Sequence, residues 1–224
     1  MPSLRNPLRS FSKPDLTPEQ WERRNRECEE AIRREREQAL ADRIARAGIP
    51  ERYRGADLAT CHPDIRAWAE DERKTGLLLQ GTFGSGKTHA ACAVLLRKIP
   101  NAPCRFVTME RLLREIRATY NGQSSEEAVI GRYVNVRCLV IDDIGKERLT
   151  EWSLPILFDI INQRYNLMKP TVITTNYTGA ALLEKLTVDG DSTTAKAIVS
   201  RLATYDRICL ADKDRRRTEG GSDG

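Results

Sequence analysis

Short apolar runs separated by longer amphipathic segments organise most of this chain. Five such runs predict strands, because a continuous apolar run of four or five residues suits a strand that is buried on both faces of a sheet. The runs cover residues 76–80, 104–108, 138–141, 171–175 and 207–210. Segments of helical pattern lie between them, and this alternation predicts an α/β fold with a parallel sheet flanked by helices.

The helical segments are predicted from the spacing of their apolar residues and from the residue types at their ends. They cover residues 63–73, 89–97, 110–120, 125–134, 150–167, 180–186 and 194–203. Pro155 is compatible with the helix over 150–167 only if it lies in the first helical turn, where a proline removes no hydrogen bond.

The N-terminal part follows a different pattern. Residues 1–16 contain three prolines among polar and basic residues and are predicted to be a disordered tail. Thr17 and Pro18 predict the start of a helix, and Gly48 predicts its end. Charged residues dominate between them and the apolar residues form one narrow stripe, so a helix over 17–48 cannot be buried alone. It is either a solvated arm packed lightly on the core or a helix that binds a partner.

Composition limits the size and the environment of the protein. With 224 residues, 40 % of them hydrophobic and 31 % charged, the chain suits one core domain and a solvated extension. The net charge of +5 is compatible with nucleic acid without requiring it.

The six cysteines form no C-x-x-C pair, so neither a zinc site nor a redox pair is predicted. Cys92, Cys138 and Cys209 lie in apolar runs and are expected to be buried. The sequence shows no signal peptide and no apolar stretch of membrane length, which predicts a cytoplasmic protein without a membrane partner.

One segment carries a specific chemical signature. Residues 81–88 read GTFGSGKT and fit the phosphate-binding pattern G-x-x-x-x-G-K-[ST] between a predicted strand and a predicted helix. Backbone N–H groups of such a loop and the positive end of the helix bind a β-phosphate, so ATP is the predicted ligand. The predicted nucleotide-binding residues are Gly81, Thr82, Phe83, Gly84, Ser85, Gly86, Lys87, Thr88 and His89. The alternative is an ordinary glycine turn.

Within this loop, Lys87 is expected to reach the β- and γ-phosphates and Thr88 to hold Mg²⁺. Asp142 and Asp143 end a later strand, at the edge where ligands bind in open α/β sheets. Asp142 is expected to orient the Mg²⁺ shell, and Asp143 to polarise the attacking water. Asn176 follows the next strand and is expected to hold that water against the γ-phosphate, although asparagine also starts turns.

Arg201 lies on a predicted helix just before the last strand, far along the chain from Lys87. A guanidinium supplied by a neighbouring subunit stabilises the charge on a transferring phosphoryl group. The position of Arg201 leaves three possibilities open, which are its own site, a neighbour's site and solvent.

A second group of basic residues is a candidate for contact with DNA. Arg111, Arg114 and Arg117 are three residues apart on one predicted helix, and Tyr120 follows. Basic side chains beside aromatic rings suit a single strand, through phosphate contacts and base stacking. The alternative is a solvated amphipathic helix whose apolar side faces the core.

Together these residues resemble the AAA+ ATPases, and within them the DnaC/DnaI-type helicase loaders and the related IstB-type transposition ATPases. The resemblance runs from about Ile49 to Leu210 and implies an AAA+ ATPase domain over residues 49–211, with a five-stranded sheet in the order 5-1-4-3-2. Its marks are the segments 48–53, 81–88, 141–147, 161–165, 174–176 and 200–202. The segment after Leu210 is too short for the C-terminal helical lid of most AAA+ proteins, as in the loaders, and residues 212–224 are predicted to be a disordered tail.

The resemblance also implies roles for single residues. It makes Asp143 the catalytic base, Asn176 a sensor of the γ-phosphate, and Arg201 the arginine that completes a neighbouring subunit's site. Arg164 is expected to be a second inter-subunit arginine. Self-association through ATP and Arg201 follows from these roles.

The implied function is ATP-dependent loading of a replicative DNA helicase onto single-stranded DNA, with the helix over 17–48 gripping the helicase and with ATP and Mg²⁺ as cofactors. The alternative is a transposition helper that binds duplex DNA and recruits a transposase. A third function, of a different class, is a nucleotide-sensing adaptor with little turnover. The joint presence of Asp143, Asn176 and Arg201 argues against that adaptor.

Overall fold

A computed structural model describes residues 17–122 and 125–210 of the chain. The predicted tails over 1–16 and 212–224 lie outside the described residues and stay predictions. The chain divides into two units, residues 1–39 and 40–224. Within the described residues, no helix is long and apolar enough to cross a membrane.

The N-terminal helix α1 (Pro18–Arg46) begins as its sequence predicts. The Thr17 N–H donates to Gln20 Oε1 at 2.9 Å, and the Gln20 N–H donates to Thr17 Oγ1 at 3.4 Å, so the first turn has a reciprocal cap. No residue of α1 is buried. Its charged side chains pair along the helix instead, as Arg23 does with Glu27.

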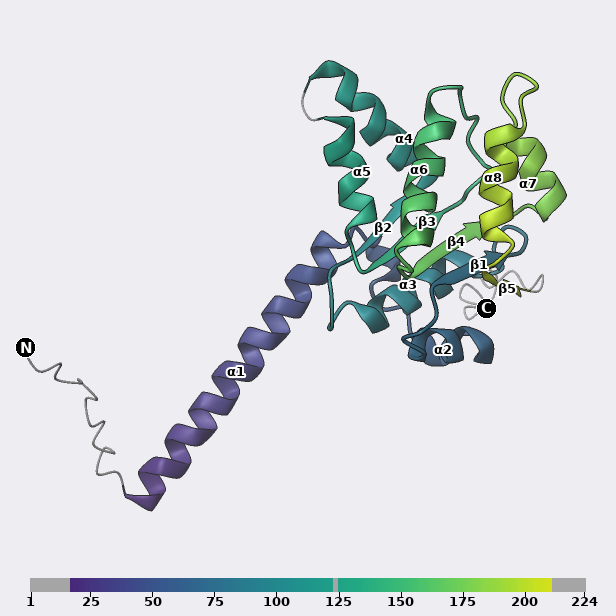
Figure 1. Ribbon diagram of the computed structural model, residues 1–224. Coiled ribbons are helices and arrows are strands. Elements are labelled where there is room, and N and C mark those ends of the chain that lie inside the picture. Colours follow the sequence, from purple (N-terminus) through teal and green to yellow (C-terminus); the bar gives the residue numbers. More distant parts are fainter. Residues whose placement is uncertain (1–16, 123–124, 211–224) are drawn as a thin grey trace, which may run out of the picture. The chain divides into compact units, whose positions relative to one another are not determined.

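The core contains a five-stranded sheet (Figure 1). Its strands are β1 (Gly76–Gln80), β2 (Cys104–Thr108), β3 (Cys138–Asp142), β4 (Thr171–Thr175) and β5 (Asp206–Cys209). All neighbouring strands are parallel, and the order β2-β3-β4-β1-β5 is the expected one. Because parallel strands all point the same way, the carboxyl ends of β1, β3 and β4 lie together at one edge.

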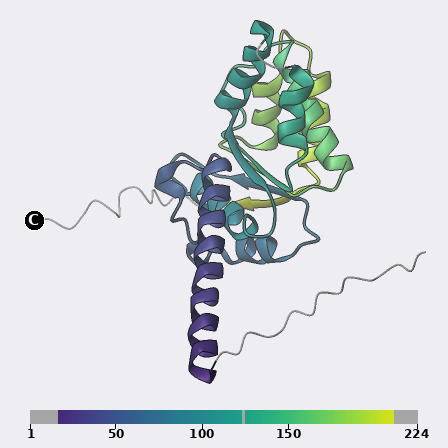
Figure 2. The same cartoon turned by 90° about the vertical axis from the view of Figure 1, so that its left-hand side faces the viewer.

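Helices cover both faces of this sheet (Figures 1 and 2). The α-helices of the core are α2 (Pro63–Glu70), α3 (Lys87–Lys98), α4 (Met109–Arg117), α5 (Glu126–Val134), α6 (Ser153–Asn166), α7 (Gly179–Leu186) and α8 (Thr193–Leu202). Three short 3₁₀ helices are η1 (Glu51–Tyr53), η2 (Leu58–Thr60) and η3 (Ala118–Asn121). Pro155 lies in the first turn of α6, as it must.

Alternate residues of β1, β2, β3 and β4 point into two separate apolar clusters. Leu139 and Ile141 of β3 pack with α4 to α8, whereas Val140, between them, packs with α2 and α3. The two-residue period of a strand therefore supplies both faces of the core from one apolar run.

Two expectations about single residues are wrong. Cys209 is exposed, because β5 is an edge strand in which Ile208 alone is buried; Cys92 and Cys138 are buried as expected. Arg164 is also not available to another subunit, since it is fully buried in α6.

Arg164 ties together the chain segments that surround it. Its guanidinium donates to the backbone carbonyls of Tyr133, Val134, Val136, Arg137 and Pro170 and to the Thr171 hydroxyl. Burial lowers the pKa of Arg164 to about 10. The residue therefore has a structural role, as a shared donor for backbone carbonyls around the end of α5 and the starts of β3 and β4.

Candidate nucleotide-binding site

The phosphate-binding loop opens into a cleft of about 340 Å³ at the carboxyl edge of the sheet. The cleft brings together most of the predicted site residues. It is lined by Phe83, Gly84, Gly86, Lys87, Thr88 and His89 of the loop and α3, by Asp143 and Asn176 after β3 and β4, and by Arg52, Tyr53 and Thr60. The expected convergence of the loop with the ends of β3 and β4 is thus present.

Glycine is required at two positions of the loop. Gly86 caps α3 with a φ of 92°, in the left-handed region that side chains rarely adopt. A Cβ atom on Gly81 would lie 2.7 Å from both the Leu210 carbonyl oxygen and Ser85 Oγ. The loop therefore follows a path that brings its backbone and the start of α3 to the cleft, where N–H groups can bind a phosphate.

The Lys87 side chain folds back over the loop that precedes it. Its Nζ donates to the Gly81 carbonyl at 2.8 Å and to the Thr82 carbonyl at 2.6 Å. Lys87 is 6 % exposed, so its ammonium group depends on these contacts. Phosphate oxygens in the cleft are stronger acceptors for the same ammonium group.

Thr88 and Asp142 form a pair of oxygen donors beside the cleft. Thr88 Oγ1 lies 3.1 and 3.2 Å from the two carboxylate oxygens of Asp142, and Thr174 Oγ1 donates to Asp142 Oδ1 at 2.6 Å. Burial raises the pKa of Asp142 to about 6 despite these hydrogen bonds.

This donor set fits Mg²⁺. A hydroxyl and a buried carboxylate are hard ligands of the kind that Mg²⁺ prefers, with phosphate oxygens and water able to fill the other positions. In the part of the chain that the structure describes, no cluster of three or more His, Cys, Asp or Glu forms a metal cage. At this place the described residues offer a metal two protein ligands, Thr88 and Asp142.

Thr174 also positions the second acid of the pair. Its Oγ1 accepts the Asp143 N–H at 2.9 Å while donating to Asp142. Asp143 has a φ of 61°, a conformation that aspartate tolerates better than most residues, and it lines the cleft. One hydroxyl thus holds the backbone of Asp143 and the carboxylate of Asp142, a role that the sequence pattern did not assign to Thr174.

Asn176 lines the cleft and carries an acceptor that no described group uses. Its Oδ1 is buried and has no hydrogen-bond partner among the described residues. A buried acceptor without a partner costs about 1–3 kcal/mol. Such an atom at a ligand cleft is suited to accept a hydrogen bond from a water beside a bound phosphate.

Three lining residues were missed by the sequence prediction. Arg52, Tyr53 and Thr60 come from η1 and η2, and the Arg52 guanidinium lies 5.1 Å from the centre of the Tyr53 ring. The segment 48–53 is one mark of the resemblance, but nothing in its pattern predicts which surface it faces. Its place follows from Ala47 and Ile49, which are buried in the core.

Arg201 does not line this cleft. It lies on α8, where its Nε and Nη2 donate to Asn162 Oδ1 of α6 at 2.9 and 2.6 Å. The guanidinium also lies 4.6 Å from the centre of the Phe158 ring. Its own chain therefore does not bring Arg201 to the nucleotide site.

The DNA candidates also lie elsewhere, on one exposed side of α4. Arg111 pairs with Glu115 and Arg114 pairs with Glu110, each within the helix, while Leu112 and Leu113 are buried. Arg117 is exposed. The side chain of Tyr120 lies outside the described residues. Pairing with acids reduces the charge that two of these arginines offer to a phosphate.

Comparison with known proteins identifies the family of this chain. The family described as "IstB-like ATP binding protein" matches residues 23–219, which is most of the chain. The chain belongs to the IstB-like ATP binding protein family. Its fold and relatives make it a DnaC/IstB-type member of the AAA+ group, with the P-loop NTPase fold that the sequence predicts.

Relatives of this IstB-like chain include two kinds of protein. The replicative helicase loader DnaC of Buchnera aphidicola subsp. Baizongia pistaciae is 27 % identical over 172 residues, covering 69 % of this chain and 70 % of that protein. The ATP-binding protein of insertion sequence IS5376 from Geobacillus stearothermophilus is 30 % identical over 138 residues, covering 61 % and 53 %.

Among solved structures, one described as the DnaC helicase loader matches with a TM-score of 0.60 and 27 % identity, over 73 % of this chain and 100 % of that one. Coverage of the curated relatives is less complete. The chain spans between 42 % and 74 % of their length, including 60 % of the Bacillus subtilis protein YqaM.

Proposed function

We propose that this protein is an ATP-dependent loader of a replicative DNA helicase onto single-stranded DNA. One observation supports the loader over its alternative. The Buchnera loader is matched over 70 % of its length, whereas the insertion-sequence protein is matched over 53 %. The ATPase core is residues 49–211, and the helix over 17–48 binds the helicase.

ATP binds in the cleft with its phosphates along the loop and the start of α3. The Lys87 ammonium exchanges its loop carbonyls for β- and γ-phosphate oxygens, and the Thr88 hydroxyl and Asp142 hold Mg²⁺. Bound Mg²⁺ neutralises charge on the phosphate oxygens. Asp143 accepts a proton from the attacking water, and Asn176 Oδ1 orients that water toward the γ-phosphate. The positions of Asp143 and Asn176 on the cleft wall support these roles.

Arg201 acts on the nucleotide of a neighbouring copy. Its absence from the cleft of its own chain supports this assignment, because phosphoryl transfer gains from a guanidinium that another subunit can supply. ATP then bridges two copies, and assembly depends on the nucleotide. Hydrolysis opens that bridge and releases the helicase on DNA.

Single-stranded DNA contacts the outer side of α4. Arg111, Arg114 and Arg117 are exposed there while the opposite side of the helix is buried. Phosphate contacts from this side give binding that weakens as salt rises.

The alternative function is a transposition helper that coats duplex DNA and recruits a transposase. The match to the insertion-sequence ATP-binding protein favours it, with 30 % identity. DNA preference separates the two functions. Tighter binding to single strands supports the loader, and filaments on long duplex DNA support the helper.

The experiment that tests the loader function is co-purification with the replicative helicase of the same organism, with and without ATP. We expect capture of the helicase by the full chain and no capture by a chain lacking residues 1–39, although that shorter chain still binds ATP. Failure of the full chain to capture the helicase under either condition contradicts the loader function.

A further inference from the structure

Arg201 is held by one neutral side chain. Asn162 Oδ1 accepts hydrogen bonds from both Nε and Nη2, at 2.9 and 2.6 Å, along one edge of the guanidinium. The Phe158 ring packs against the guanidinium at 4.6 Å, and the Tyr165 ring lies at 6.0 Å. These three residues occupy successive turns of α6, so the helix forms a cradle that fixes the plane of the guanidinium.

The hydrogen bonds leave part of the guanidinium unused. An arginine carries five N–H donors in a planar fork. Besides the two donors that Asn162 accepts, one on Nη1 is directed at the Ala197 carbonyl at 3.0 Å. One donor on Nη1 and one on Nη2 have no acceptor within residues 17–122 and 125–210. Donors on the two terminal nitrogens are the pair that can bind two oxygens of one phosphate side by side.

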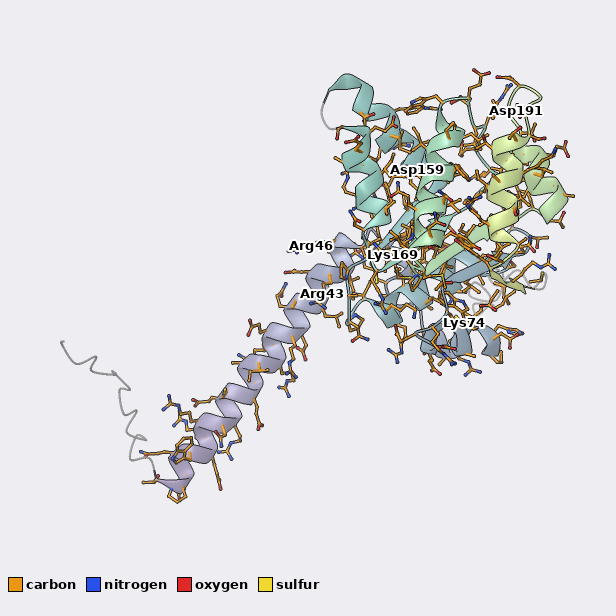
Figure 3. The ribbon with its side chains drawn as sticks, in the orientation of Figure 1. Arg43, Arg46, Lys74, Asp159, Lys169 and Asp191 are labelled. Carbon is orange, nitrogen blue, oxygen red and sulfur yellow. The ribbon has the colours of Figure 1, made fainter. Side chains whose placement is uncertain are left out.

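The cradle also leaves the charge of Arg201 unneutralised. No carboxylate of a described residue lies within ion-pair distance of Arg201. The nearest acid on α6 is Asp159 (labelled in Figure 3), which accepts a hydrogen bond from Gln163 at 2.9 Å instead. An asparagine fixes an arginine without competing for its charge, whereas an aspartate at position 162 would do both.

We propose that Asn162 is a positioning residue, which holds Arg201 so that its two terminal donors face the γ-phosphate of ATP bound to a neighbouring copy of this chain. This inference rests on the proposed action of Arg201 on a neighbour's nucleotide. Asn162 pre-organises the guanidinium, so the arginine loses little conformational freedom when the phosphate arrives.

The first test is steady-state ATP turnover of the full chain. We expect Asn162→Ala to lower kcat about 10-fold with a KM for ATP within about twofold, because the arginine loses its position but the nucleotide keeps its own site. Asn162→Asp keeps an acceptor at the same place, so its kcat should exceed that of Asn162→Ala, but its added charge competes for the guanidinium and should keep kcat below wild type. The matched control is Gln163→Ala, which breaks a hydrogen bond on the same helix without touching Arg201 and should stay within about twofold of wild type.

A mixing experiment separates positioning from a general structural role. A Lys87→Ala chain cannot use ATP but can supply Arg201 to an Arg201→Ala chain, so turnover of the mixture reports Arg201 acting between copies. Adding Asn162→Ala to the chain that supplies Arg201 should cut this turnover about 10-fold. Adding it to the other chain should leave turnover unchanged.

Three results overturn the inference. These are wild-type kcat for Asn162→Ala, equal activity of the Ala and Asp variants, and equal losses whichever chain of the mixture carries Asn162→Ala. Each leaves the proposed function intact if Arg201→Ala is still inactive. Full turnover of Arg201→Ala alone removes the proposed action of Arg201 on a neighbour's nucleotide, and the inference with it.

Discussion

The burial of Arg164 predicts that its replacement destroys stability and that lysine cannot rescue it. Six oxygens accept hydrogen bonds from this guanidinium, and five of them are backbone carbonyls. A buried carbonyl that loses its partner costs about 1–3 kcal/mol. If water enters and satisfies all but two of the carbonyls, Arg164→Ala still loses about 2–6 kcal/mol.

That loss is large beside the total stability of a domain, which is about 5–15 kcal/mol. Arg164→Lys should lose nearly as much, because an ammonium has three donors for these six acceptors and lacks the planar fork that spans them. The assay is urea unfolding without nucleotide, followed by circular dichroism. The control is Arg137→Ala, an exposed arginine paired with Glu72, which should lose less than about 1 kcal/mol.

A different result would refute this explanation of Arg164. If Arg164→Ala unfolds at the wild-type urea concentration yet fails to hydrolyse ATP, the guanidinium acts in catalysis or assembly. Its contacts with residues 133–137 would then be dispensable.

Three further predictions concern the nucleotide site and the DNA surface. Lys87→Ala should lower ATP affinity at least about 100-fold in calorimetry, because the ammonium group contacts the phosphates directly; retained affinity would contradict the site. Burial raises the pKa of Asp142 from 3.8 to about 6, so the folded state binds the proton of this carboxyl group more tightly than the unfolded state does. The free energy of unfolding of the nucleotide-free protein should therefore fall as pH rises from about 4 to 6. Asp142→Asn should remove the pH dependence of stability, raise the melting temperature at pH 7 and abolish ATP turnover. An unchanged dependence of stability on pH in this variant would contradict the assignment to Asp142. Replacement of Arg111, Arg114 and Arg117 together by alanine should weaken oligonucleotide binding and flatten its salt dependence, and an unchanged salt slope would show that α4 does not contact DNA.

The sequence predicted the sheet well because its signal is local. The strands β1, β3 and β4 are buried along their whole length, and burial on both faces of a parallel sheet requires a run of largely apolar residues. The positions of the loop over 81–88 and of the acids after β3 could also be predicted from local signals. A residue at the end of a strand lies at a known edge of the sheet, once the strands are known to be parallel. The structure places Asp143 and Asn176 with Lys87 on one cleft, as that reasoning expects.

Residues whose role depends on distant segments could not be predicted. In the sequence, Arg164 cannot be distinguished from a solvent-exposed arginine on a helix. Its burial depends on hydrogen bonds to backbone carbonyls about 30 residues earlier in the chain. The sequence identifies Thr174 only as a strand residue. Its hydrogen bonds with Asp142 and Asp143 require the register of β3 beside β4. Tyr53 reaches the cleft only through the packing of η1 on α3.

The claim that a neighbour's arginine completes the nucleotide site is tested most directly by mixing two inactive chains. Lys87→Ala and Arg201→Ala are each expected to show turnover reduced about 10³-fold. An equal mixture should recover about a quarter of wild-type turnover, because about one interface in four pairs an intact loop with an intact arginine. No recovery in the mixture, or wild-type turnover by Arg201→Ala alone, would contradict the account.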